Sequence, residues 1–288
     1  MNKIYFSIVI IFFSIGLLPV SAQRTERIVI LHTNDTHSQI EPAKPQNLGG
    51  YARRMALIDK TRNQETNVLL FDAGDYWQGT TFFNFFRGRA EIDGMNRMRY
   101  DAVALGNHEF DNGIDTAAAV LSGAKFPILD ANYDLSATPL KNFVKPYIVL
   151  QRFGMRIGVF GLSPAPTGLI LPENFNNAVF KEPIKTAIET SEFLKKKEKC
   201  DVIVCLSHIG WTNDENYAKV NVNANAAAND SVLAAASEYI DVIIGGHTHT
   251  MLADNTIILN KRGKPVIVAQ VGRSGMYVGR IDLTLNKK

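Results

Sequence analysis

The stretch RIVILHTNDTH, residues 27–37, places an apolar, β-branched run directly before a group of metal-binding residue types. Short Val/Ile/Leu runs that end at Gly, Asn or Asp favour buried strands over helices. Four further stretches repeat this arrangement: VLLFDAGD (68–75), DAVALGNHEFD (101–111), DVIVCLSH (201–208) and DVIIGGHTH (241–249). Polar clusters after five such runs predict one metal centre assembled from distant parts of the chain.

Spacing within the clusters suggests which side chains act together. Asp35 and His37 are two positions apart, and so are His247 and His249. In an extended segment, side chains at i and i+2 point the same way, so each pair is expected to face a common point. His32 is one residue off this parity and is expected to be structural. Imidazole nitrogens and carboxylate oxygens suit a divalent ion such as Zn, Mn, Fe or Co.

Alternation of strands with amphipathic segments predicts an α/β domain whose sheets are covered by helices. The expected helices are Leu48–Arg62, Arg89–Arg99, Gly113–Ala124, Glu182–Lys197 and Ala226–Tyr239. Two regions differ: residues 147–161 indicate a hairpin, and residues 256–285 indicate a closing antiparallel meander of three strands. A mixed sheet, or two sheets, follows. Open α/β sheets bind ligands at the carboxyl ends of their strands, where all five clusters lie.

Residues 1–22 are typical of a secretory signal peptide, with Lys3, an apolar stretch from Ile4 to Leu18, and small residues up to Ala22. Cleavage after Ala22 would give an exported, periplasmic protein without stable membrane insertion. An uncleaved anchor is the alternative, but the apolar stretch is shorter than the about 20 residues a span requires. The net charge of +3 indicates neither a nucleic-acid polymer nor an anionic membrane as partner.

The only two cysteines, Cys200 and Cys205, are not expected to form a disulfide. Five positions along one strand separate their Cα atoms by about 16 Å. A disulfide requires less than about 7 Å. Both are therefore predicted to be buried as small apolar residues.

Two other stretches each allow two interpretations. YWQGTTFFNFF, residues 76–86, is either an aromatic platform for a base or a packing surface for the following helix, and packing is favoured because aromatic residues are mostly core. GGYARR, residues 49–54, could hold a phosphate at a helix N-terminus. A plain helix start with exposed arginines is the favoured interpretation there.

The ordered set of clusters resembles the calcineurin-like metallophosphoesterases. More narrowly, LHTND (31–35) and GRSGMYVGR (272–280) resemble the catalytic domain of bacterial 5'-nucleotidases of the UDP-sugar hydrolase type. The resemblance runs from about Arg27 to the C-terminus. It implies a four-layer αββα sandwich, with two mixed sheets flanked by helices, and one catalytic domain over residues 23–288.

The resemblance also implies roles for individual residues. Two divalent metal ions would be held, the first by Asp35, His37 and His249, the second by Asn107, His208 and His247, with Asp75 bridging them. An anionic bridge allows two dications to lie about 3.5 to 4 Å apart, which suits both ends of a phosphoryl displacement. A metal-bound hydroxide would attack, and His108 would be the general acid, oriented by Asp111. Taken alone, Asp75 could be a helix N-cap, and Asp111 could cap the helix after it.

Complete 5'-nucleotidases of this type carry a second domain that recognises the nucleoside, whereas this chain stops at Lys288. The expected substrate is a small phosphate monoester, in particular a 5'-nucleotide. The domain would act alone, or as the catalytic half of a split nucleotidase whose C-terminal domain is a separate polypeptide. Alternatives are a 2',3'-cyclic nucleotide phosphodiesterase, a hydrolase of another ester, and a non-catalytic subunit. The complete ligand set together with His108 and Asp111 disfavours the last of these.

Overall fold

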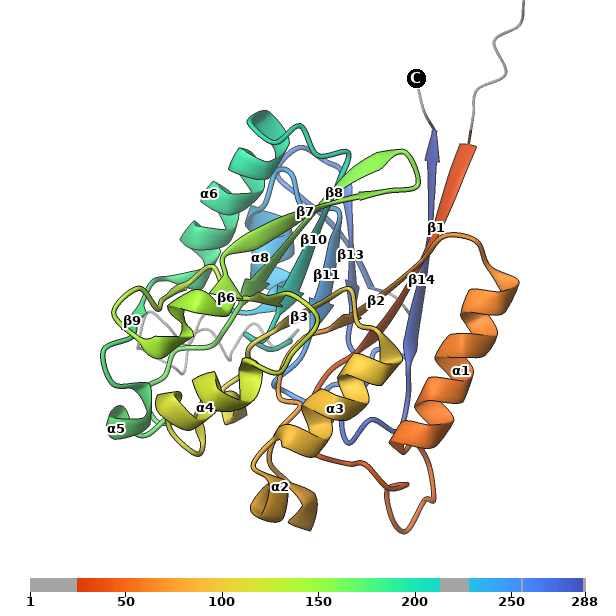
Figure 1. The fold of residues 1–288 in the computed structure, drawn as a ribbon. Coiled ribbons are helices and arrows are strands. Elements are labelled where there is room, and N and C mark those ends of the chain that lie inside the picture. Colours follow the sequence, from red (N-terminus) through yellow and green to blue (C-terminus); the bar gives the residue numbers. More distant parts are fainter. Residues whose placement is uncertain (1–24, 213–227, 255, 287–288) are drawn as a thin grey trace, which may run out of the picture.

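Two six-stranded sheets form the centre of the computed structural model, which describes residues 25–212, 228–254 and 256–286 (Figure 1). The first sheet has the order β14 (Gly279–Asn286), β1 (Thr25–Thr33), β2 (Val68–Asp72), β3 (Ala102–Ala104), β4 (Ile128–Leu129) and β6 (Val144–Lys145). The strands from β1 to β6 in this order are parallel, and β14 pairs antiparallel with β1.

The second sheet also has a parallel centre with antiparallel edges. Its order is β12 (Thr256–Leu259), β13 (Pro265–Ala269), β11 (Val242–Gly245), β10 (Val202–Ser207), β8 (Met155–Leu162) and β7 (Tyr147–Arg152). The outer strands β12 and β7 are the antiparallel ones. A small separate ladder joins β5 (Tyr133–Asp134) to β9 (Val179–Phe180).

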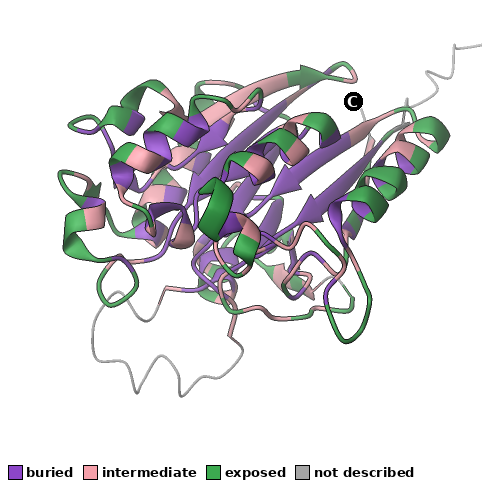
Figure 2. Cartoon of the chain, turned by 60° about the horizontal axis from the view of Figure 1, so that its bottom comes forward, coloured by how far each residue is buried: buried purple, intermediate pink, exposed green. Residues whose placement is uncertain are grey.

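Helices cover the outer face of each sheet (Figure 1). The first sheet packs against α1 (Tyr51–Gln64), α3 (Arg89–Met98) and α4 (Ile114–Leu121), and the second against α6 (Pro183–Lys196) and α8 (Asp230–Ala236). The shorter elements are α2 (Thr81–Phe86), α5 (Pro172–Phe175) and the 3-10 turns η1 (His108–Phe110) and η2 (Pro139–Asn142). Figure 2 shows the strands buried between helices whose outer faces are exposed.

Alternating side chains on the strands build three apolar layers. In β1, Val29 and Leu31 pack toward the helices of the first sheet, whereas Ile28 and Ile30 face the second sheet. In β10, Ile203 packs toward α6 and α8, whereas Val204 joins the layer between the sheets. Because both faces are buried, these strands have nearly continuous apolar sequences.

The predicted mixed α/β fold, with two sheets flanked by helices, is confirmed. The hairpin is confirmed as β7 and β8, and the two cysteines are free and buried. The expected meander is wrong in its last step. β12 and β13 pair antiparallel, as expected, but β14 belongs to the first sheet and pairs with β1. There its Ile281 joins the apolar layer between the two sheets. Burial of that apolar face favours the crossing over a local meander.

The predicted signal peptide lies outside the described residues. Among the helices that the structure does describe, none has the length and apolar character needed to cross a bilayer.

Candidate active site

The five polar clusters lie in loops at the carboxyl ends of β1, β2, β3, β10 and β11. The structure brings their side chains into three groups whose nitrogen or oxygen atoms lie within 4.8 Å of one another. These groups are Asp35 with His37 and His249, His37 with Asp75 and His108, and Asp75 with His208 and His247. Shared members join the three groups into one centre, and Asp75 belongs to two of them.

The backbone at this centre is unusual, because five candidate ligand residues have positive φ: Asp35, His37, Asp75, His247 and His249. Left-handed backbone is uncommon for residues other than glycine and concentrates at functional sites. The i, i+2 argument from the sequence is therefore wrong in its reason, since both pairs lie in loops beyond β1 and β11. His247 and His249 also enter different groups instead of facing one point.

His208 has the hydrogen bonding of a metal ligand. Its Nδ1 donates to the carbonyl oxygen of Ala73 at 2.6 Å, so in the neutral imidazole the lone pair lies on Nε2. That Nε2 is fully buried and lies 2.9 Å from Oδ2 of Asp75 without a hydrogen bond of ordinary geometry. Two acceptor atoms facing each other in a buried site require a proton or a cation between them.

One further contact and one unpaired oxygen atom have the same character. His37 Nδ1 donates to the carbonyl oxygen of Trp77 at 3.2 Å, and its Nε2 lies 2.9 Å from Nε2 of His249. The buried Oδ1 of Asn107 has no hydrogen-bond partner among the residues that the structure describes. Imidazole, carboxylate and amide oxygen donors with unpaired lone pairs therefore fit a pair of divalent cations.

The histidines at the centre differ in the direction of their pKa shifts. Despite burial, which acts in the opposite direction, the carboxylate of Asp75 raises the pKa of His208 to about 10. Burial, followed by the nearby His208, lowers the pKa of His247 to about 4. Burial lowers the pKa of His37 as well. The lowered pKa values keep the imidazoles of His37 and His247 neutral, so that each can donate a lone pair. Together with the buried carboxylates of Asp35 and Asp75, they make a centre suited to positive ions.

The loops support the ligands through backbone hydrogen bonds. Asp35 accepts the N–H of His247 at 3.0 and 3.1 Å on its two carboxylate oxygens. Asn34 donates to Oδ2 of Asp35 at 2.6 Å and to the carbonyl oxygen of Gly272 at 2.7 Å, and it accepts from the N–H of Val271. This role of Asn34 was not predicted from the sequence, where its only signal was its position beside Asp35.

His108 lies at the rim of the centre. Its Nδ1 is 2.8 Å from Oδ2 of Asp111, and its ring centroid is 5.3 Å from that of His37. Despite burial, which lowers it, the hydrogen bond to Asp111 and the charge of Asp75 raise the pKa of His108 to about 9. Asn174 holds the backbone of Asp111 by donating to its carbonyl oxygen at 3.0 Å. A partly exposed, oriented imidazole of this kind can hold a proton for a leaving group.

A family model described as calcineurin-like phosphoesterase matches residues 28–251. The chain belongs to this family. A trifunctional nucleotide phosphoesterase of Bacillus subtilis, YfkN, is 33% identical over 91% of this chain and 18% of its own length. Human 5'-nucleotidase is 31% identical over 91% of this chain and 47% of its own length. The chain thus spans about half, or less, of the length of these curated relatives.

Solved structures agree with this family assignment. The 5'-nucleotidase precursor of Thermus thermophilus matches with a TM-score of 0.77 and 35% identity, over 89% of this chain and 51% of its own. The matched region therefore corresponds to a metallophosphoesterase domain of 5'-nucleotidase type.

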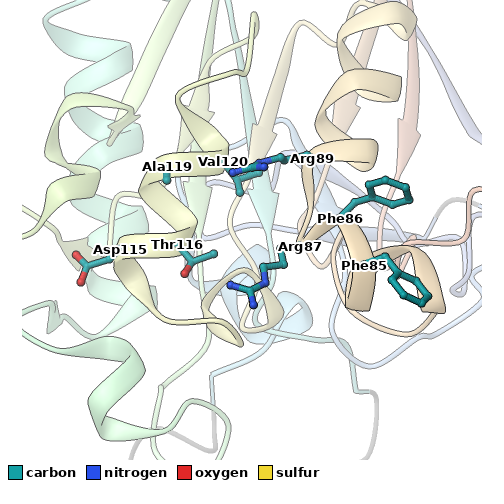
Figure 3. Close-up of a pocket in the computed structure, with 8 residues that line it drawn as sticks. All are labelled: Phe85, Phe86, Arg87, Arg89, Asp115, Thr116, Ala119 and Val120. Carbon is teal, nitrogen blue, oxygen red and sulfur yellow. The ribbon is translucent and has the colours of Figure 1, made fainter.

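The aromatic stretch of this phosphoesterase, residues 76–86, is partly buried as packing and partly exposed. Tyr76, Trp77 and Phe83 are buried, whereas Phe85 and Phe86 are exposed. The exposed pair borders a groove of about 510 Å³ between α2 and α4 (Figure 3). The groove is lined by Phe85, Phe86, Arg87, Arg89, Asp115, Thr116, Ala119 and Val120, and by none of the candidate ligands. Packing therefore explains only part of the stretch.

The expectation of exposed arginines at the start of α1 is wrong for one of them. Arg54 is buried and stacks over the Tyr51 ring at 5.0 Å. It also donates to the carbonyl oxygen of Gly275 at 3.4 Å. Arg54 is thus packed inside the domain. His32, expected to be structural, is buried against Gly279, and burial lowers its pKa to about 4.

Proposed function

We propose that this protein is a metal-dependent phosphoester hydrolase of 5'-nucleotidase type that releases phosphate from 5'-nucleotides. The observation that carries the proposal is the position of Asp75, which is grouped with His37 on one side and with His208 and His247 on the other, as a carboxylate between two dications would be. Asp35, His37 and His249 would hold one ion, and Asn107, His208 and His247 the other. When bound, such a pair supplies an activated water and neutralises charge on the phosphoryl group.

The chain's own residues account for the remaining chemistry. His108 would hold the proton that the leaving oxygen takes, and Asp111 would fix the imidazole through Nδ1, so that Nε2 faces the substrate. His108 is partly exposed, whereas Asp35, Asp75 and His208 are buried, so its imidazole is able to reach a substrate. Asp111 would act through His108 as a positioning residue.

Two substrate classes are candidates for this activity, 5'-nucleotides and 2',3'-cyclic nucleotides. The B. subtilis relative is named a trifunctional nucleotide phosphoesterase, which favours more than one activity on nucleotides, and 2',3'-cyclic nucleotides are the second substrate class to test. The further length of the relatives favours substrate recognition by residues outside the matched region. A separate polypeptide is one proposed source of such residues, and co-purification of a second chain with the tagged protein would test that partner.

Export to the periplasm is part of the proposal. It is supported by the apolar leader in residues 1–22 and by the similarity to a snake venom 5'-nucleotidase of Crotalus adamanteus, 31% identical over 91% of this chain. Mass determination of the protein recovered from periplasm should give an N-terminus at Gln23. Recovery only of the uncleaved chain in membranes would contradict cleavage.

The activity is tested by phosphate release from the Mn- or Zn-loaded protein, with 5'-nucleotides, 2',3'-cyclic nucleotides and an aryl phosphate as substrates. His108→Ala should lower turnover by about 100-fold or more with bound metal unchanged, because it removes only proton transfer. His208→Ala should lower the metal content instead. No turnover of any substrate by metal-loaded protein would rule out the proposal.

A further inference from the structure

Glu109 is a buried carboxylate that joins two loops of the candidate active site. Only 1% of the residue is exposed. Its Oε1 accepts the N–H groups of Tyr76 at 3.0 Å and Trp77 at 3.2 Å. Its Oε2 accepts those of Asp75 at 3.0 Å and Gly106 at 2.6 Å. Two backbone donors thus converge on each oxygen of this one carboxyl group.

The four hydrogen bonds fix the backbone of Asp75 relative to β3. The N–H of Asp75 points to Glu109, and its carboxylate Oδ1 accepts the N–H of His108 at 2.9 Å. Asp75 is therefore held at both its backbone and its side chain by the turn that follows β3. Its second oxygen, Oδ2, is left facing Nε2 of His208.

Gly106 shows how close this approach is. A Cβ atom at Gly106 would lie 2.1 Å from Oδ1 of Asp75 and 2.6 Å from its backbone nitrogen. Only glycine at position 106 allows the loop after β2 and the loop after β3 to approach this closely. The N–H of Gly106 is also one of the four that Glu109 accepts.

We infer that Glu109 is the positioning residue that sets the distance between the two ion sites. It does so by holding Asp75, the carboxylate shared by both, against the turn that carries Asn107 and His108. This inference rests on the proposed metal-dependent function. It assigns Glu109 no contact with substrate, because all of its described partners are backbone N–H groups.

Replacement of Glu109 by glutamine isolates this role. The amide nitrogen of the introduced side chain would face backbone N–H groups that need an acceptor. Two of the four hydrogen bonds that Glu109 accepts would therefore be lost. The loop carrying Asp75 should then move relative to His208. Loss of such supporting contacts lowers metal affinity or activity by about 10- to 100-fold.

The test is electron paramagnetic resonance of the Mn-loaded protein, with Mn affinity measured by calorimetry. Wild type should bind two ions that give an exchange-coupled signal. Glu109→Gln should bind one of them about 10- to 100-fold more weakly and lose the coupled signal at equal Mn. Turnover should recover at high Mn, which a loss of catalytic chemistry would not allow.

Two variants control for folding. Asp130→Asn makes the same carboxylate-to-amide change at another buried site and should keep the coupled signal. Glu109→Asp keeps the charge but shortens the reach, and it carries the same test if Glu109→Gln does not fold. A coupled signal and Mn affinity equal to wild type in Glu109→Gln would overturn the inference. Absence of paired Mn in wild type would instead overturn the proposed function and, with it, this role.

Discussion

Asp130 is a buried carboxyl group whose contacts favour the neutral acid. Its Oδ1 accepts the N–H groups of Asn132 and Tyr133, and its Oδ2 lies 2.7 Å from the hydroxyl of Ser163. The same hydroxyl lies 2.7 Å from the carbonyl oxygen of Leu105, and it has one proton to donate. A proton on Asp130 satisfies both contacts. Burial raises the pKa of Asp130 to about 7.

Asp130→Asn should remove a pH dependence of stability. Because the pKa is higher in the folded state, unfolding releases a proton between about pH 4 and 7, and the free energy of unfolding falls as pH rises. The slope reaches at most about 1.4 kcal/mol per pH unit. Asparagine keeps Oδ1 and can donate to Ser163, so the variant should gain stability over wild type at pH 8 relative to pH 5. Urea denaturation at both pH values measures this gain, and an equal difference at the two would contradict it.

At the scale of elements, β8 approaches the first sheet so closely that one of its glycines has no room for a side chain. A Cβ atom at Gly161 would lie 2.1 Å from the carbonyl oxygen of Leu129 in β4. The N–H of Ala131 donates to the carbonyl oxygen of Gly161 at 2.9 Å, which ties the two sheets together there. Gly158, on the same strand, faces instead the flexible ends of Cys200 and Leu194 at 3.0 to 3.2 Å.

Gly161→Ala should therefore destabilise the fold more than Gly158→Ala. Backbone atoms in a packed layer cannot move aside, so the first change should cost about 1–3 kcal/mol of the free energy of unfolding. The second displaces only side-chain ends and serves as the matched control. Urea midpoints followed by circular dichroism compare them, and equal midpoints would show that the sheets separate easily at this point.

At the scale of the whole molecule, the candidate ligands come from both sheets. Asp35, Asp75 and Asn107 follow strands of the first sheet, whereas His208, His247 and His249 follow strands of the second. A metal pair bound there would link the two halves of the sandwich. Folding and metal binding should therefore be coupled.

Removal of metal by a chelator should lower the melting temperature. At free metal about 100-fold above Kd, the bound ion contributes about 2.7 kcal/mol, because it binds only the folded state. For a chain of this size that corresponds to roughly 5–10 °C. His208→Ala should show a much smaller shift in scanning calorimetry. A wild-type melting temperature that does not change as metal is removed would contradict the coupling.

The sequence by itself determined the strands and the class of site that follows them. Apolar runs such as those before Asp35 and Asp75 favour buried strands, their alternation with amphipathic segments predicted the fold class, and the polar clusters after them predicted residues that the structure gathers. Local patterns carry this information because each strand and each cluster is contiguous in the chain.

Only the tertiary structure decided how distant segments combine. The pairing of β14 with β1, the separation of His247 from His249, and the burial of Arg54 depend on contacts between residues far apart in sequence. The same holds for Glu109, whose partners lie in two loops. A local pattern fixes which face of a strand is apolar, but the partner that buries it, and the left-handed turns that aim each ligand, follow from packing of the whole domain.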